Sequence, residues 1–177
     1  MKFFIRFISA AAACMLLYAC PYSSTHVLDE TPGIYVEDDL LGNWATFVKK
    51  PVSGKQEPVK VILSKKNDTE YNISFTGSLS ELKPFRVIDK DSINGTAFMS
   101  TVDGKQFFNI TIKDNIYIAE IIFKKGLLSL MPLSEHFTAK MIMTNADLRN
   151  SIAVHYKTRV IPLYDDDFCL REMVKVN

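Results

Sequence analysis

The residues with the most defined chemistry lie near the start of the chain, where a cysteine follows a small residue. Residues 1–20 begin with two basic side chains, continue with an apolar run over 7–19 and end with Ala19 and Cys20. A basic segment, a short apolar segment and a small residue before a cleavage point are typical of a secretory signal peptide. The apolar run has 13 residues, whereas a membrane-spanning helix needs roughly 20. The sequence therefore predicts a signal peptide over residues 1–19.

The end of this segment, Leu17-Tyr18-Ala19-Cys20, resembles the lipobox of bacterial lipoproteins. The resemblance implies that Cys20 is the site of lipidation. It would carry a diacylglyceryl group on its sulfur, become the acylated N-terminus and hold the protein on a membrane. Two lipid chains anchor a protein far more firmly than one. The alternative is an ordinary secretory signal, cleaved near Ala13 or Ala19, without a lipid.

The residue after the cysteine bears on location. Proteobacterial lipoproteins that stay at the inner membrane carry Asp at this position, and Pro21 stands here instead. The resemblance therefore implies a bacterial cell envelope protein, lipid-anchored on the periplasmic face of the outer membrane.

Charge and cysteine content restrict the partners. Removal of residues 1–19 changes the formal net charge from +1 to −1, and basic pairs such as Lys65-Lys66 and Lys124-Lys125 are scattered. Nucleic-acid-binding proteins carry clustered basic patches, so we expect no nucleic-acid partner. Cys169 would be the remaining free thiol, which rules out an intramolecular disulfide and leaves the core to packing.

The chain after Cys20 divides into two parts. Residues 20–39 contain Ser23-Ser24-Thr25, Pro32-Gly33 and an acidic run, without a sustained hydrophobic period. This composition predicts a flexible, lipidated tether that lets the domain stand off the bilayer. A single β domain is expected over residues 40–177.

The elements that must position any functional residue are mostly strands. Runs rich in Val, Ile, Thr, Phe and Tyr alternate with turn residues at the 8–12-residue spacing of barrels and sandwiches. We expect strands over 42–50, 59–65, 70–76, 85–88, 95–102, 105–113, 116–124, 127–132, 137–143 and 168–176. Turns are expected at Asn94-Gly95, Asp103-Gly104, Asp114-Asn115 and Lys125-Gly126. Thr144-Asn145-Ala146-Asp147 has the form of a capping box and predicts one late helix, which Pro162 would stop.

The order of these elements, together with Gly42-Asn43-Trp44 at the first strand, resembles the lipocalin family. The resemblance implies a mainly β fold: a single antiparallel β-barrel with one C-terminal helix and a closing strand. It also implies that the Trp44 indole closes one end of the barrel. In lipocalins a basic residue just before the helix packs over this indole, and Lys140 is the nearest here. A half-barrel or a β-sandwich stays open as an alternative.

The run 116–123 is apolar on both faces. Ile116, Ile118 and Ile122 share one face with Glu120, and Tyr117 lies on the other face. A half-buried strand shows one polar face, so we expect the barrel interior to cover one side and the late helix the other. Glu120 would then be a partly buried carboxylate that needs a partner. It is either a polar handle in a pocket or a residue that is paired or lies near a strand end. Trp44, Tyr117 and Glu120 are the candidate binding residues.

Other chemistry was sought along the chain. His26, His136 and His155 lack the spacing of zinc ligands, and the acidic run 165–167 lacks that of a calcium loop. No phosphate-binding glycine loop or Gly-x-Ser-x-Gly motif occurs. His155 and Tyr156 with Arg159 form the one polar group on the predicted helix. We therefore expect no catalytic residues, no metal and no cofactor.

These observations leave three functional hypotheses, of which the last, an enzyme, would need convergent polar residues in one cleft that the sequence does not show. The first is a lipid-anchored, non-enzymatic binding module whose barrel takes an apolar or amphipathic small molecule. The second is a protein-interaction lipoprotein, such as an inhibitor or immunity protein in the periplasm.

Overall fold

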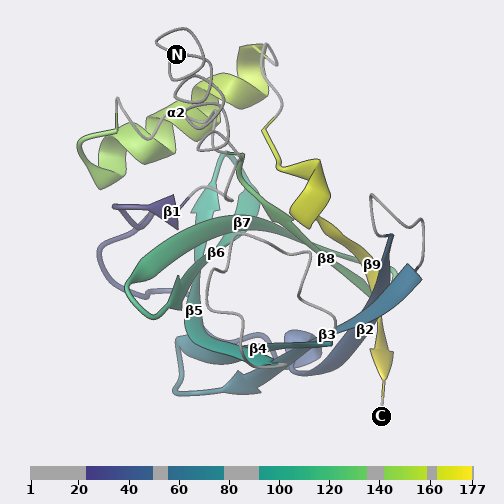
Figure 1. Ribbon diagram of the computed structural model, residues 1–177. Helices are drawn as coiled ribbons and strands as arrows, with labels where there is room; N and C mark the ends of the chain where they lie inside the picture. Colours follow the sequence, from purple (N-terminus) through teal and green to yellow (C-terminus); the bar gives the residue numbers. More distant parts are fainter. Residues whose placement is uncertain (1–22, 50–55, 78–91, 135–141, 159–162, 177) are drawn as a thin grey trace, which may run out of the picture.

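Eight strands form a closed antiparallel β-barrel, with a helix and a ninth short strand on its outside (Figure 1). This architecture is that of a computed structural model, which describes residues 23–49, 56–77, 92–134, 142–158 and 163–176. The predicted mainly β fold is confirmed, as are the single antiparallel barrel, the C-terminal helix and the closing strand. The half-barrel and the sandwich are excluded because the last strand pairs with the first strand of the barrel.

The barrel strands follow the order of the chain. They are β2 (Gly42–Lys49), β3 (Gln56–Lys65), β4 (Glu70–Gly77), β5 (Ser92–Val102), β6 (Lys105–Ile112), β7 (Asn115–Lys124), β8 (Leu127–Pro132) and β9 (Leu170–Val176). Each strand pairs with the next, and β9 pairs with β2. The other elements are β1 (Ser23–Ser24), the 3₁₀ turns η1 (Asp38–Leu40) and η3 (Asp166–Phe168), and the helix α2 (Asn145–Thr158).

Alternation along the strands builds two separate apolar layers. Inward-facing residues fill the barrel core, which includes Trp44, Tyr71 and Phe108. On the outer face of β5, β6 and β7, a second cluster includes Phe107 of β6 and Ile152 of α2. Strand β7 contributes to both layers, so the expectation that both of its faces are covered is confirmed.

Two of the predicted turns have the geometry of two-residue hairpins. Both residues of Asp103-Gly104 have positive φ, at 48° and 74°, and both residues of Lys125-Gly126 do so at 54° and 75°. Such turns match the right-handed twist of the strands they join. The β6–β7 turn falls at Lys113-Asp114, one residue earlier than predicted, because Asn115 pairs with Ile112 and begins β7.

The predicted turn at Asn94-Gly95 is wrong. Both residues lie inside β5, where Gly95 pairs with Ile73 of β4. A Cβ atom built on Gly95 would lie 2.3 Å from the backbone oxygen of Thr111 in β6. The glycine therefore permits a close approach of two backbones, which is its other common role in strands.

We expect Gly95→Ala to lower the free energy of unfolding by about 1–3 kcal/mol, because the β6 backbone must shift to admit a methyl group. Urea denaturation measures the effect. Gly33→Ala is the matched control, since nothing lies within 4 Å of a Cβ built there, and it should change stability by less than about 0.5 kcal/mol. Equal stability of the two variants would contradict the close approach of β5 and β6.

Several boundaries differ from expectation near the end of the chain. The helix begins where the capping box predicts: Thr144 Oγ1 accepts from the Asp147 N–H at 3.1 Å and donates to Asp147 Oδ2 at 2.9 Å. Strand β9 begins two residues later than predicted, after η3. The predicted strand 85–88 lies outside the described residues, as does most of 137–143, of which the described residues 142 and 143 belong to no strand.

The segment predicted to be a flexible tether is packed against the barrel from Ser23 onward. Strand β1 pairs with the start of β7, and the Leu28 N–H donates to Oδ1 of buried Asn109 at 2.6 Å. Asp29 forms an ion pair of 2.6 Å with Arg149 of α2. The segment lacks a regular period because it buries single side chains as it wraps the barrel. The tether prediction does not hold for residues 23–39, and residues 20–22 lie outside the described part.

Candidate functional site

Trp44 is buried in the barrel core. Its side chain is 1% exposed, and its Nε1 donates to the backbone oxygen of Leu40 in η1 at 2.8 Å. Phe123 meets the indole edge-on, with ring centroids 5.9 Å apart. Nζ of Lys175 lies 5.4 Å from the ring centroid. The indole is therefore packed as a member of the barrel core.

The cation over the indole comes from an unexpected place. Lys175 belongs to β9, near the C-terminus, whereas the resemblance pointed to Lys140, which lies outside the described residues. Gly42 makes the arrangement possible, because a Cβ atom there would lie 2.7 Å from Cε of Lys175. Gly42 also has φ of 130°, which side-chain-bearing residues rarely adopt.

Large side chains fill the barrel interior around Tyr71 and Phe108. Their rings meet edge-to-face with centroids 5.0 Å apart, and neither has exposed surface. A side chain without exposed surface contacts other atoms on every side, so no water-sized space borders these rings. The Tyr71 hydroxyl accepts from the Glu37 N–H at 2.7 Å, and burial raises the pKa of this hydroxyl. Tyr117 is also a buried member of this core.

Glu120 lies on the outer face of β7, beneath α2, and is 2% exposed. Its Oε2 accepts a hydrogen bond of 2.5 Å from the Tyr156 hydroxyl and another from the Tyr164 hydroxyl. The two hydroxyls are 3.2 Å apart. Nζ of Lys105, which is half exposed, lies 3.7 Å from Oε1. These four residues form the Glu120 cluster.

The Glu120 carboxyl group is paired with two tyrosine hydroxyls and one lysine ammonium group. Burial, followed by the hydrogen bond to Glu120, raises the pKa of both tyrosine hydroxyls. Both therefore stay protonated and serve as donors to the carboxylate. The cluster joins β6, β7, α2 and the segment before β9, so its contacts are those of a structural junction.

The three candidate binding residues do not meet in one site. Trp44 and Tyr117 lie in the barrel core, and Glu120 lies on the opposite face of β7 from Tyr117. Sequence reasoning missed two members of the Glu120 cluster, Lys105 and Tyr164. The hairpin register could have found Lys105, because Phe107 pairs with Glu120 and Lys105 is two residues away on the same face.

Two further groups from the sequence have ordinary surroundings. His155 meets Tyr156 edge-on at 6.1 Å, and Arg159 lies outside the described residues. The Cys169 thiol is half-buried and donates to the Asp165 backbone oxygen at 3.2 Å. Burial raises the pKa of this thiol to about 12, so it is protonated and a poor nucleophile at neutral pH.

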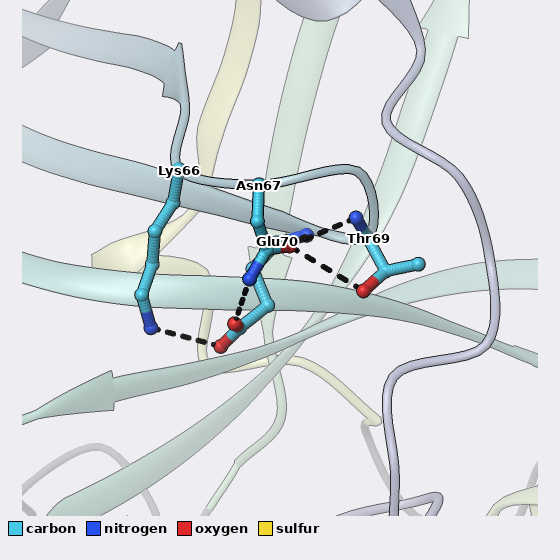
Figure 2. Close-up of polar contacts among 4 residues, drawn as sticks. All are labelled: Lys66, Asn67, Thr69 and Glu70. Carbon is cyan, nitrogen blue, oxygen red and sulfur yellow. Dashed lines mark hydrogen bonds and ion pairs between the residues drawn. The ribbon is translucent and has the colours of Figure 1, made fainter.

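Figure 2 shows a polar cluster in the turn between β3 and β4. Oδ1 of Asn67 accepts from the N–H groups of Thr69 and Glu70 at 2.9 and 2.8 Å. The Glu70 carboxylate accepts from Lys66 Nζ at 3.0 Å and from Asn67 Nδ2 at 2.5 Å. These two hydrogen bonds hold the pKa of Glu70 below its usual value. The side chains satisfy one another, so the cluster stabilises the turn.

The described residues offer neither a metal site nor a membrane-spanning helix. Within them, no group of three or more His, Cys, Asp or Glu side chains is arranged to hold a metal ion. The same residues include no helix long and apolar enough to cross a bilayer.

No protein-family model, no curated protein and no solved structure matches this chain. The barrel architecture therefore rests on the structure of this chain alone.

Proposed function

We propose that this protein is a lipid-anchored envelope protein that binds another protein through the outer surface of its barrel, without catalysis. The packed barrel interior carries the proposal. Tyr71 and Phe108 have no exposed surface, so the middle of the barrel is occupied by the chain itself. Large apolar side chains stand on the outside instead, with Phe47 66% exposed.

The lipid anchor is supported by the lipobox-like residues at 17–20 and by the position of β1. Ser23, which pairs with β7, follows Cys20 by three residues. Three residues reach at most about 10 Å. A lipid on Cys20 would therefore hold the β1 side of the barrel close to the bilayer.

Replacement of the proposed lipidation site tests the anchor. We expect Cys20→Ala to move the protein from the membrane fraction to the soluble fraction, because two acyl chains supply the affinity. The measurements are fractionation of cells and labelling with a radioactive fatty acid. Cys169→Ala is the matched control and should keep both the label and the membrane location. Absence of label on the unaltered protein, or membrane retention of Cys20→Ala, would contradict the proposal.

A small apolar molecule in the barrel is the second candidate. Eight-stranded barrels can hold one small ligand, and this interior is lined by apolar side chains. Mass spectrometry of an organic extract from the purified full-length protein distinguishes the two. The protein-binding proposal expects no molecule in stoichiometric amount beyond the lipids attached to Cys20.

A further inference from the structure

Exposed apolar side chains gather on the outer face of β2, β3, β8 and β9. We define the outer patch as Ala45, Phe47, Ile62, Leu127 and Val174. Phe47 is 66% exposed, Val174 50% and Ile62 37%, while Ala45 and Leu127 are half-buried. All five alternate with inward-facing core residues on their strands, so their side chains lie on the outer face.

The strand register places the five side chains of the outer patch near one another, with exposed Asn43 and Lys60 among them. Val174 of β9 pairs with Leu127 of β8 on one side and with Ala45 of β2 on the other. Phe47 lies two residues beyond Ala45, and Ile62 lies two residues beyond the pairing partner of Ala45. Directly paired side chains have Cβ atoms about 5 Å apart, and diagonal neighbours lie about 7–8 Å apart. The patch therefore spans four adjacent strands.

This surface differs from the rest of the barrel wall. The outer face of an antiparallel sheet that meets water is normally polar, and β4 follows this rule with Asn72, Ser74 and Thr76. The outer face of β5, β6 and β7 is apolar, but α2 packs on it. The outer patch is apolar and exposed, an arrangement that marks interaction sites in soluble domains.

Charges at the outer patch indicate the chemistry of its partner. Lys60 pairs with Ala45, and Lys124 pairs with Leu127. Both lysines are exposed, and neither forms an ion pair with a described residue. The nearby Arg171 is neutralised by Asp166 at 2.6 Å. A partner with an apolar surface and carboxylates placed to meet Lys60 and Lys124 would match this surface, whereas a second copy would add further lysines to it.

The β2 and β3 part of the outer patch lies away from the proposed anchor, whereas its β8 part adjoins β7. Strand β1 lies beside β7 on the side of the barrel that carries α2, and β2 and β3 lie across the barrel from it (Figure 1). A lipid three residues before Ser23 would place the bilayer on the β1 side. Phe47 of β2 and Ile62 of β3 would then face the aqueous compartment, which favours a protein over a lipid surface as their occupant.

We infer that the outer patch is the docking surface for an acidic protein, an inference that rests on the proposed function and names the surface and its partner. Photo-cross-linking in the native cells tests it, with the full-length protein and benzoylphenylalanine at Phe47 or at Val174. Asn72, on the polar outer face of β4, is the matched control position. We expect one protein partner to be cross-linked at Phe47 and Val174 and not at Asn72, through a segment rich in Asp and Glu.

The charge argument has its own test. The double substitution Lys60→Glu with Lys124→Glu should lower the cross-link yield at Phe47 at least about fivefold, because it opposes like charges. Lys113→Glu, in the exposed β6–β7 turn, should leave the yield unchanged. Circular dichroism and membrane fractionation of each variant separate loss of folding or of the anchor from loss of docking.

Four outcomes would overturn the inference while leaving the anchor proposal intact. They are a cross-link to a second copy of this chain, a cross-link to lipid, equal labelling from Asn72, and no cross-link from a protein that is folded and in the membrane fraction. Soluble protein in the same fractionation would instead contradict the lipid anchor itself.

Discussion

Trp44→Ala is expected to lower the free energy of unfolding by about 3–5 kcal/mol. The substitution removes an indole that is 1% exposed and leaves a cavity in the barrel core. It also leaves the Leu40 backbone oxygen without its donor and Phe123 without its edge-on neighbour. Urea denaturation followed by circular dichroism measures the change.

Phe47→Ala is the matched control for this prediction. Both aromatic residues lie on β2, three positions apart, but Phe47 points outward and is 66% exposed. It should change stability by about 0.5 kcal/mol or less. Lys175→Ala is expected to cost about 0.5–1 kcal/mol, the usual worth of an exposed cation–π contact. Similar unfolding curves for Trp44→Ala and Phe47→Ala would show that Trp44 does not contribute to stability as a buried core residue.

Glu120→Ala is expected to cost about 2–3 kcal/mol, the second-largest effect. The Tyr156 and Tyr164 hydroxyls would lose their common acceptor while partly buried, and the penalty for unsatisfied donors sets the size of the loss. Glu120→Gln should cost about 1 kcal/mol, because an amide oxygen of similar position still accepts. Lys105→Ala should cost less than about 1 kcal/mol, since this lysine is half exposed.

A double-mutant cycle separates the network from simple loss of packing. If the Tyr164 hydroxyl is held by Glu120, then Glu120→Ala and Tyr164→Phe together should cost less than the sum of the two single losses by about 1 kcal/mol. Additive losses would indicate that the carboxylate and the hydroxyl do not interact. If Glu120→Ala were as stable as the unaltered protein, Glu120 would not stabilise the contact between β7 and α2.

The sequence between residues 105 and 124 illustrates how far local pattern reaches. Two alternating runs predicted β6 and β7 with nearly correct ends, because side chains alternate sides in any strand. The apolar character of both faces of β7 predicted a second layer outside the barrel, and α2 supplies it. The turn at Asp103-Gly104 followed from residues that tolerate positive φ. Each of these inferences depends on neighbours within about ten positions.

Contacts between residues that are distant in the sequence could not be predicted from local patterns. Asn94-Gly95 has the composition of a turn, and its place inside β5 depends on the backbone of β6 beside it. Lys175 reaches the Trp44 indole only because the last strand closes the barrel next to the first. Tyr164 meets Glu120 across 44 positions.

The sequence by itself determined most of the barrel strands, most hairpin turns, the helix start and the partial burial of Glu120, since alternation, turn preference and capping act through adjacent residues. Only the tertiary structure decided what Glu120 pairs with, that residues 23–40 wrap the barrel, and that the outer patch forms one surface. These features depend on which strands become neighbours when the barrel closes, and that pairing is set by the packing of the whole domain.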